Sequence, residues 1–250
     1  SRGLGDVYKR QTFINTCFEN RKMSYYEHCR YRNFEGVAIV CADFNDPDVL
    51  ELMNSDLPVV TIDYVHHNCT AVSSNNIQGM EDLVKYIYGQ GHRKIAYIHG
   101  QQASYVTKDR LASFYRTVDE LGLKIPDEYI RTADYLETRE AAKQTKELLN
   151  LEDPPTCIIY PDDTSLIGGR NVIIEMGLRI PRDISIAGYD GTRMSQLLHP
   201  QLTTIRQDTE LIGSEAAKRL IGSIEKPRTT LVERVVIEGI LVAGKSVGRI

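Results

Sequence analysis

The sequence predicts an α/β protein with two doubly wound lobes of parallel sheet. Three observations support this fold class. Short apolar runs alternate with longer amphipathic segments, which is the pattern of right-handed βαβ units. The apolar runs lack the alternation of half-exposed strands, so we expect strands that are buried on both faces. Polar breaks fall near residues 71–74 and 206–208, where we expect the chain to cross between the lobes.

The predicted lobes are discontinuous in sequence, because the chain is expected to cross between them at these two polar breaks and at a third point that only the family resemblance given below implies. The amino-terminal lobe comprises residues 12–73 and 208–233, and the carboxyl-terminal lobe comprises residues 74–207 and 234–250. Residues 1–11 have neither a helical nor a strand period. We expect them to be a sequence scar or a disordered end outside the fold.

The predicted strands are short apolar runs, rich in β-branched residues. Residues 36–42 (GVAIVCA) are typical of a strand between two helix layers, and residues 184–190 (ISIAGYD) form a second such run that ends in a carboxylate. The predicted strands are, in order, 12–15, 36–42, 57–63, 94–100, 156–160 and 184–189, followed by a β-prone run from residue 202 and strand-like runs within 232–242.

The predicted helices are amphipathic segments with recognisable start and stop signals. Pro47 stands near the start of one helix, and glycines such as Gly122 and Gly177 follow the ends of others. The predicted helices are, in order, 23–33, 46–55, 74–88, 108–121, 138–149, 165–176 and 208–224.

Composition narrows the class of protein. The chain has 250 residues, of which 42% are hydrophobic and 26% are charged, with a net charge of −4. These values predict a globular protein without the basic surface of a nucleic-acid-binding domain. The five cysteines are scattered, odd in number and without a C-x-x-C pair, which favours reduced thiols and a cytoplasmic location. No apolar run is long enough for a membrane helix.

Two apparent motifs do not predict chemistry. Residues 239–246 match the phosphate-loop pattern G-x-x-x-x-G-K-S, but strand-forming residues occupy the middle and only residues 247–250 follow, so the match is a coincidence. His66, His67 and Cys69 match no closed zinc spacing, and we interpret them as a polar loop. We therefore predict neither a metal nor a cofactor.

Polar side chains at the ends of predicted strands are the candidate ligand contacts, because ligands of parallel α/β sheets bind at the carboxyl edge. Asp63 ends the strand 57–63, and Asp190 directly follows the strand 184–189. The β-prone run from residue 202 becomes polar at Gln207, where the next helix begins. These positions predict a site for a polar small molecule.

Charged residues near the starts of two predicted helices are further candidates for ligand contacts. Arg110 lies near the first turn of a predicted helix, where its guanidinium could clamp adjacent hydroxyls or a carboxylate. Asp162 and Asp163 follow the strand 156–160 and begin a helix. One of them is expected to cap the helix, and our interpretation is that Asp163 caps it while Asp162 faces the crevice.

Several segments together resemble one family. They are Gly91–Ile98 (GHRKIAYI), Asp109–Leu111 (DRL), Pro181–Asp190 (PRDISIAGYD) and Leu202–Asp208 (LTTIRQD). Over about residues 34–246 the chain resembles the effector-binding core of the lactose/galactose-repressor (LacI/GalR) family, which shares its fold with periplasmic sugar-binding proteins.

The resemblance implies a fold, a ligand and a set of contacts. The fold is periplasmic-binding-protein-like (type I), with two lobes, three crossovers and a sugar or sugar-like effector in the cleft. The typical residue at position 162 is Asn, and since Asp only accepts hydrogen bonds, the effector should present hydroxyls there. The ligand-binding side chains that the resemblance implies are Asp63, Arg110, Asp162, Asp190 and Gln207.

The chain departs from the family at its start. Members of the family read operator DNA with an amino-terminal helix-turn-helix and a hinge helix, and nothing like them precedes residue 34. We also expect the first strand and helix of the amino-terminal lobe to be missing. The chain is therefore expected to be a truncated sensor that forms a homodimer and does not bind DNA by itself.

Three hypotheses for the function follow. The leading one is the effector-sensing, dimerising core of a cytoplasmic transcriptional regulator of carbohydrate use. The second is a periplasmic or lipid-anchored sugar-binding protein of an uptake system. The third is a glycosidase that uses Asp162 and Asp190, which would require two carboxylates about 5 to 9 Å apart. No acid/base or nucleophile motif supports an enzyme.

Overall fold

The computed structural model describes residues 11–14, 17–18 and 21–250, so most of the segment 1–11 that we set aside lies outside the described residues. The contacts divide the chain into two compact units. Unit 1 comprises Ser1–Val72 and Ser214–Val235, and unit 2 comprises Ser73–Gly213 and Val236–Ile250. The chain therefore passes from one unit to the other three times. Within the described residues no helix is long and apolar enough to cross a bilayer.

Unit 1 is built on a sheet with the strand order β11-β5-β4-β3, in which β3, β4 and β5 are parallel. Its main core packs β3 and β4 against α1 and α2, through residues such as Cys29, Ile39 and Leu52. Gly36, which directly precedes β3, leaves room for Leu220 and Ile224 of α8. The elements are β1 (Cys17–Phe18), β2 (Arg21–Lys22), α1 (Tyr25–Tyr31), β3 (Val37–Ile39), α2 (Pro47–Met53), β4 (Val59–Ile62), β5 (Thr70–Ser74), α8 (Thr209–Glu225) and β11 (Arg234–Ile237).

Unit 2 is built on a six-stranded sheet with the order β12-β10-β9-β8-β6-β7. Its strands are parallel except β12, which runs antiparallel to β10. The elements are α3 (Asn76–Gly89), β6 (Ile95–His99), α4 (Tyr105–Glu120), the 3-10 helix η2 (Asp127–Tyr129), β7 (Ile130–Thr132), α5 (Thr138–Leu149), β8 (Cys157–Ile159), α6 (Asp163–Glu175), β9 (Ser185–Asp190), α7 (Arg193–Leu197), β10 (Thr203–Arg206) and β12 (Ile240–Val242).

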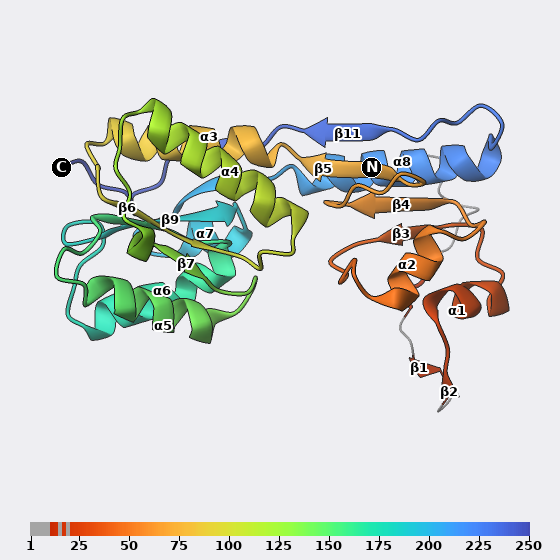
Figure 1. The fold of residues 1–250 in the computed structure, drawn as a ribbon, viewed down its shortest axis with the longest axis horizontal. Coiled ribbons are helices and arrows are strands. Elements are labelled where there is room, and N and C mark those ends of the chain that lie inside the picture. Colours follow the sequence, from red (N-terminus) through yellow and green to blue (C-terminus); the bar gives the residue numbers. More distant parts are fainter. Residues whose placement is uncertain (1–10, 15–16, 19–20) are drawn as a thin grey trace. The chain divides into compact units, whose positions relative to one another are not determined.

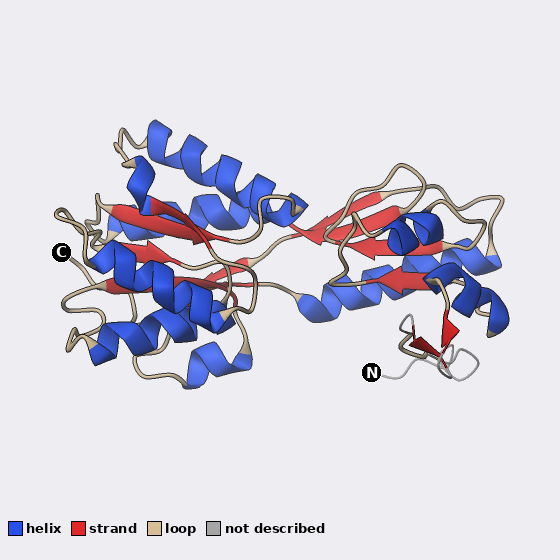
Figure 2. Ribbon diagram, turned by 60° about the horizontal axis from the view of Figure 1, so that its bottom comes forward, coloured by secondary structure: helices blue, strands red, loops and turns tan. Residues whose placement is uncertain are grey.

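Helices cover both faces of this sheet, as Figures 1 and 2 show. Alternate residues of β6 enter different cores. Ile95 and Tyr97 pack with α3 and α4, whereas Ala96 and Ile98 pack with α5 and α6. The same separation holds for β9, where Tyr189 enters the first core and Ile186 the second. The predicted burial of the central strands on both faces is therefore confirmed.

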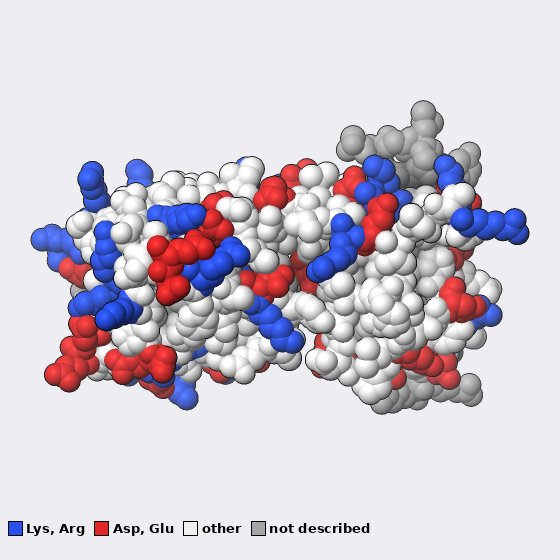
Figure 3. Space-filling view, turned by 45° about the horizontal axis from the view of Figure 1, so that its top comes forward, with Lys and Arg blue, Asp and Glu red and all other residues white. Residues whose placement is uncertain are grey.

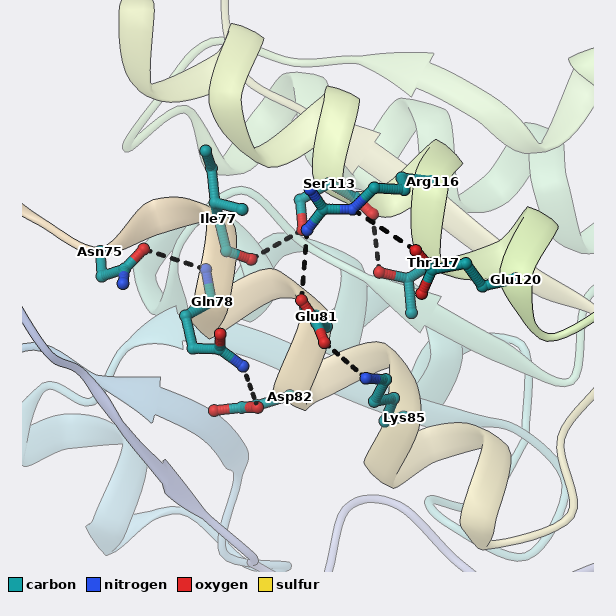
Figure 4. Close-up of polar contacts among 10 residues, drawn as sticks. All are labelled: Asn75, Ile77, Gln78, Glu81, Asp82, Lys85, Ser113, Arg116, Thr117 and Glu120. Atoms are coloured by element: carbon teal, nitrogen blue, oxygen red, sulfur yellow. Dashed lines mark hydrogen bonds and ion pairs between the residues drawn. The ribbon is translucent and has the colours of Figure 1, made fainter.

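Polar contacts join α3 and α4 on the outer side of unit 2 (Figure 4). Ser113 Oγ donates a hydrogen bond to the carbonyl oxygen of Ile77 at 2.7 Å. Glu81 forms ion pairs with Lys85 on its own helix and with Arg116 on α4. These contacts hold the second half of α4, which follows Arg110, close to α3.

Several elements differ from the prediction, and the short strands β1 and β2 and the 3-10 helix η2 were not predicted. Residues 12–14 form no strand, and Asn15 lies outside the described residues. The strands β5 and β7 were not predicted, because TAVSS and IRT contain too few large apolar residues to stand out. Helix α7 was also not predicted, since five residues are too few to show a helical period.

Candidate functional site

The candidate site of unit 2 lies at the carboxyl edge of the sheet, and Arg110 is its positive charge. Arg110 is buried in α4, where Nε donates to Asn76 Oδ1 at 2.8 Å and Nη1 donates to the Pro161 carbonyl oxygen at 2.9 Å. The guanidinium lies on the ring of Tyr189, 3.4 Å from its centroid. Since this cation–π contact and two hydrogen bonds fix three sides of the group, Arg110 has one orientation.

Asp190 and Gln207 form a hydrogen-bonded pair beside this charge. Asp190 ends β9 and Gln207 follows β10, and the two strands are adjacent and parallel. Gln207 Nε2 donates to Asp190 Oδ1 at 2.6 Å, and the Gln207 backbone N–H donates to the Asp190 carbonyl oxygen at 3.2 Å. Burial raises the pKa of Asp190, and the charge of Arg110 and the Gln207 hydrogen bond oppose this effect.

The structure corrects the predicted roles of the two aspartates at the start of α6. Asp162, not Asp163, is the N-cap, because its backbone is extended with φ −157° and ψ 167°. Its Oδ1 accepts from the backbone N–H of Thr164 at 2.9 Å and of Ser165 at 2.8 Å. Its Oδ2 accepts from Ser165 Oγ at 2.7 Å and from the Leu136 N–H at 3.0 Å.

Asp162 is 1% exposed, and four hydrogen bonds within the chain already use both of its oxygens. The carboxylate therefore orients the site by holding the loop at Leu136 to the end of α6. Asp163 is buried nearby and bonds to Thr192 and Thr204 instead. Burial raises the pKa of Asp163 to about 6.

Tyr135 is a site residue that the sequence analysis missed. Its hydroxyl forms a hydrogen bond with Thr107 Oγ1 of α4 at 2.8 Å. Burial raises the pKa of Tyr135, and the charge of Arg110 opposes this effect. The ring packs on Gly100, where a Cβ would come within 2.2 Å of it. Candidate residues were expected at the ends of predicted strands, and β7, the strand that precedes Tyr135, was not predicted.

Asp63 is the fifth predicted contact, and it lies in unit 1. It follows β4, its φ is +60°, and its N–H donates to the Val72 carbonyl oxygen at 3.0 Å. The structure thus brings Arg110, Asp162, Asp190 and Gln207 to one edge of unit 2 and places Asp63 after a strand of the other unit.

The two motifs that we set aside have ordinary structures. Cys69 is buried, 3.8 Å from His66 Nδ1, and burial raises the pKa of its thiol to about 11. Among the described residues no group of three His, Cys, Asp or Glu side chains could hold a metal ion. The phosphate-loop match contains β12, and residues 243–250 form no helix.

The fixed cation, the carboxylate and the amide suit a ligand with neighbouring hydroxyls. Arg110 can donate two parallel hydrogen bonds, Asp190 accepts from hydroxyls, and Gln207 can do both. A neutral polyol would satisfy all three groups without adding charge to the site.

Comparison with known proteins identifies similar sequences. Residues 84–247 match the periplasmic-binding-protein-like domain family. The repressor PurR of Aliivibrio salmonicida is 29% identical over 224 residues, which are 88% of this chain and 63% of that protein. The probable repressor ExuR of Bacillus subtilis is 27% identical over 207 residues, which are 82% of this chain and 62% of that protein. The chain therefore spans less than two thirds of the length of these relatives.

Solved structures have the same fold. A putative transcriptional regulator LacI from Bacillus cereus matches with a TM-score of 0.82 and 26% identity, over 88% of this chain and 79% of that one. A LacI family regulator from Enterococcus faecium, solved with bound ribose, matches with a TM-score of 0.80 over 92% of this chain and 86% of that one. Its 22% identity supports the fold alone.

Proposed function

Because the chain belongs to the family of periplasmic-binding-protein-like domains, we propose that it is the effector-binding core of a LacI/GalR-type transcriptional regulator. The predicted resemblance to this family is confirmed by the similarity to repressors and to a LacI regulator structure. The relatives are transcriptional regulators rather than uptake proteins or glycosidases, so the two alternative hypotheses are not favoured.

The proposed effector is a sugar or a similar neutral polyol. The observation that carries this proposal is the fixed orientation of Arg110 beside the Asp190–Gln207 pair. Arg110 and Asp190 can each bind two adjacent hydroxyls, which is how proteins distinguish polyols from apolar ligands. Asp162 supports the site as the cap of α6, and Asp63 is proposed as a contact from unit 1. Ribose in one structural neighbour and cellobiose in another are ligands of this chemical class.

Isothermal titration calorimetry with a panel of monosaccharides and disaccharides tests the proposal. We expect at least one sugar to bind more tightly than millimolar, and Asp190→Ala to weaken that sugar at least tenfold. Asp153→Ala is the matched control, because Asp153 is an exposed carboxylate before β8 that pairs with Lys94 on the surface. If no sugar binds the parent chain, or if Asp190→Ala leaves the sugar affinity unchanged, the sensor proposal is wrong.

Operator DNA is proposed as a partner of the whole regulator and not of these 250 residues. The net charge of the chain is −4, and acidic and basic side chains are interspersed on the face in Figure 3. Such a surface gives little electrostatic attraction to phosphates. The cytoplasmic location predicted from the cysteines belongs to the same proposal.

A homodimer through α6 and α7 completes the proposal. Ile174 of α6 is 50% exposed, and Met194 and Leu197 of α7 are 56% and 77% exposed. Arg170 Nη2 of α6 donates to the carbonyl oxygen of His199, two residues beyond α7, at 2.9 Å. Exposed apolar side chains on adjoining elements are typical of subunit interfaces, and a symmetric dimer would cover them.

A further inference from the structure

Asp163 is a buried carboxylate that takes no part in capping α6. Its Oδ2 accepts from the Thr192 backbone N–H at 2.7 Å and from Thr192 Oγ1 at 3.1 Å. Its Oδ1 accepts from Thr204 Oγ1 at 2.8 Å. Asp163 thus joins three elements of unit 2 that are separate in sequence, which are α6, the start of α7 and β10.

The segment that Asp163 holds is the turn 190–192, which begins at the last residue of β9. Asp190 and Gly191 have φ values of +100° and +64°, so two consecutive residues lie in the left-handed region. This conformation is costly for Asp190 and persists only where surrounding contacts hold it. At Gly191 a Cβ would come within 2.4 Å of the Arg206 Cα, so no other residue fits there.

Thr204 connects the buried carboxylate to this turn. Its hydroxyl donates to Asp163 Oδ1 and accepts from the Gly191 N–H at 3.3 Å. The Thr192 N–H reaches Asp163 directly. Both peptide groups after Asp190 are therefore tied to Asp163, one directly and one through Thr204.

A glycine in β9, Gly188, makes room for the carboxylate of Asp163. A Cβ on Gly188 would come within 2.4 Å of Asp163 Oδ1 and within 3.3 Å of Leu166. Only glycine at position 188 of β9 lets Asp163 approach the strand this closely. The pattern Gly188-Tyr189-Asp190-Gly191 thus places Asp190 between two glycines that accommodate neighbouring groups.

We propose that Asp163 is a positioning residue that, through Thr192 and Thr204, holds the 190–192 turn and thereby directs the Asp190 carboxylate toward the effector. The part of this inference that concerns the effector rests on the proposed function. Holding the turn is a property of the unliganded chain and can be tested separately. Because Thr192 is also the N-cap of α7, the same contacts connect Asp190 to the surface proposed for dimerisation.

Hydrogen exchange of single amides tests the turn. Thr204→Val keeps the side-chain shape and removes the hydroxyl, whereas Thr204→Ser keeps the hydroxyl. We expect exchange at the Gly191 and Thr192 amides to accelerate at least tenfold in Thr204→Val and in Asp163→Asn, and to stay within twofold of the parent chain in Thr204→Ser. The Thr164 and Ser165 amides, which Asp162 holds, are the internal control and should not change.

Unchanged exchange at Gly191 and Thr192 in Thr204→Val would overturn the inference, as would equal acceleration in Thr204→Ser. The conservative pair decides the matter even if Asp163→Asn fails to fold. A calorimetric titration adds the effector arm, with the tightest sugar of the panel binding at least tenfold more weakly to Thr204→Val than to Thr204→Ser. If no sugar binds the parent chain, the proposed function fails while the exchange result still decides the role of Asp163.

Discussion

Asp163 shows what burial does to a single carboxylate in this protein. Burial raises its pKa to about 6 from the ordinary 3.8, although hydrogen bonds from Thr204 and Thr192 act in the opposite direction. The folded chain therefore holds this proton more tightly than the unfolded chain. Protonation then favours folding, so the stabilising contribution is present below pH 3.8 and is lost as the pH rises through about 6.

The expected consequence is a difference in pH dependence between the parent chain and Asp163→Asn. From pH 4 to pH 7 the parent chain should lose up to about 3 kcal/mol of unfolding free energy through this group, because one pKa unit corresponds to about 1.36 kcal/mol. The variant should lack that component. Urea unfolding at several pH values measures it, with Asp153→Asn as an exposed control. Parallel curves for parent and variant would contradict the assignment.

The glycines of the helices show how closely the elements pack. Gly168 lies on α6 where it meets α5, and a Cβ there would come within 1.8 Å of the Thr138 carbonyl oxygen. Gly89 ends α3, and a Cβ there would meet nothing within 4 Å. Both are helical glycines of unit 2, but only at Gly168 does the close packing of two helices require the absence of a side chain.

Alanine at these two glycines should therefore have opposite effects on stability. Gly168→Ala forces α5 and α6 apart and should cost about 1–3 kcal/mol of unfolding free energy. Gly89→Ala should be neutral or stabilising by up to about 1 kcal/mol, because alanine is the better helix former. Urea unfolding of both variants gives the comparison. Equal destabilisation would mean that the loss at Gly168 has another cause than the contact with Thr138.

At the scale of the whole molecule, the proposed dimer surface is concentrated in unit 2. Leu197 is 77% exposed on α7, and Leu231 in unit 1 has the same exposed fraction. If exposure alone drove association, both leucines would matter equally. The proposal assigns the contact to α6 and α7, so only Leu197 should contribute.

Sedimentation velocity at micromolar protein tests this assignment. We expect the parent chain and Leu231→Glu to sediment as dimers and Leu197→Glu to sediment as a monomer, because a buried, unpaired carboxylate would face the partner subunit. A monomeric parent chain would refute the homodimer. A dimer that survives in Leu197→Glu but not in Leu231→Glu would move the interface to unit 1.

Most elements of this fold could be predicted because their signals are local. Helix α5 has the predicted bounds, 138–149, and α6 and β9 differ from the prediction by one or two residues at each end. The strands β5 and β7 could not be predicted, because their hydroxyl and charged residues acquire strand structure only from neighbours in the sheet.

The candidate site shows the same division. The end of a strand identified Asp190, and the start of a helix together with the family resemblance identified Arg110, but Tyr135 follows a strand that has no sequence signal. Which of Asp162 and Asp163 would cap α6 could not be decided from their order alone. The outcome depends on Thr192 and Thr204, which lie about 30 and 40 residues further along the chain.

The sequence by itself determined the alternation of strands and helices, the membership of the family and the strand ends at which a ligand could bind. These properties follow from periodicity and short motifs, which are formed by residues close together in the sequence. Only the tertiary structure decided that Asn76 and Tyr189 orient Arg110, that Gln207 pairs with Asp190 and that Asp162 is the cap. The contacts of Arg110 and Gln207 join residues from different elements. Asp162 is left as the cap because Asp163 bonds to Thr192 and Thr204, which also lie outside α6. The packing of the sheet and its helices determines which of these residues come within hydrogen-bond distance.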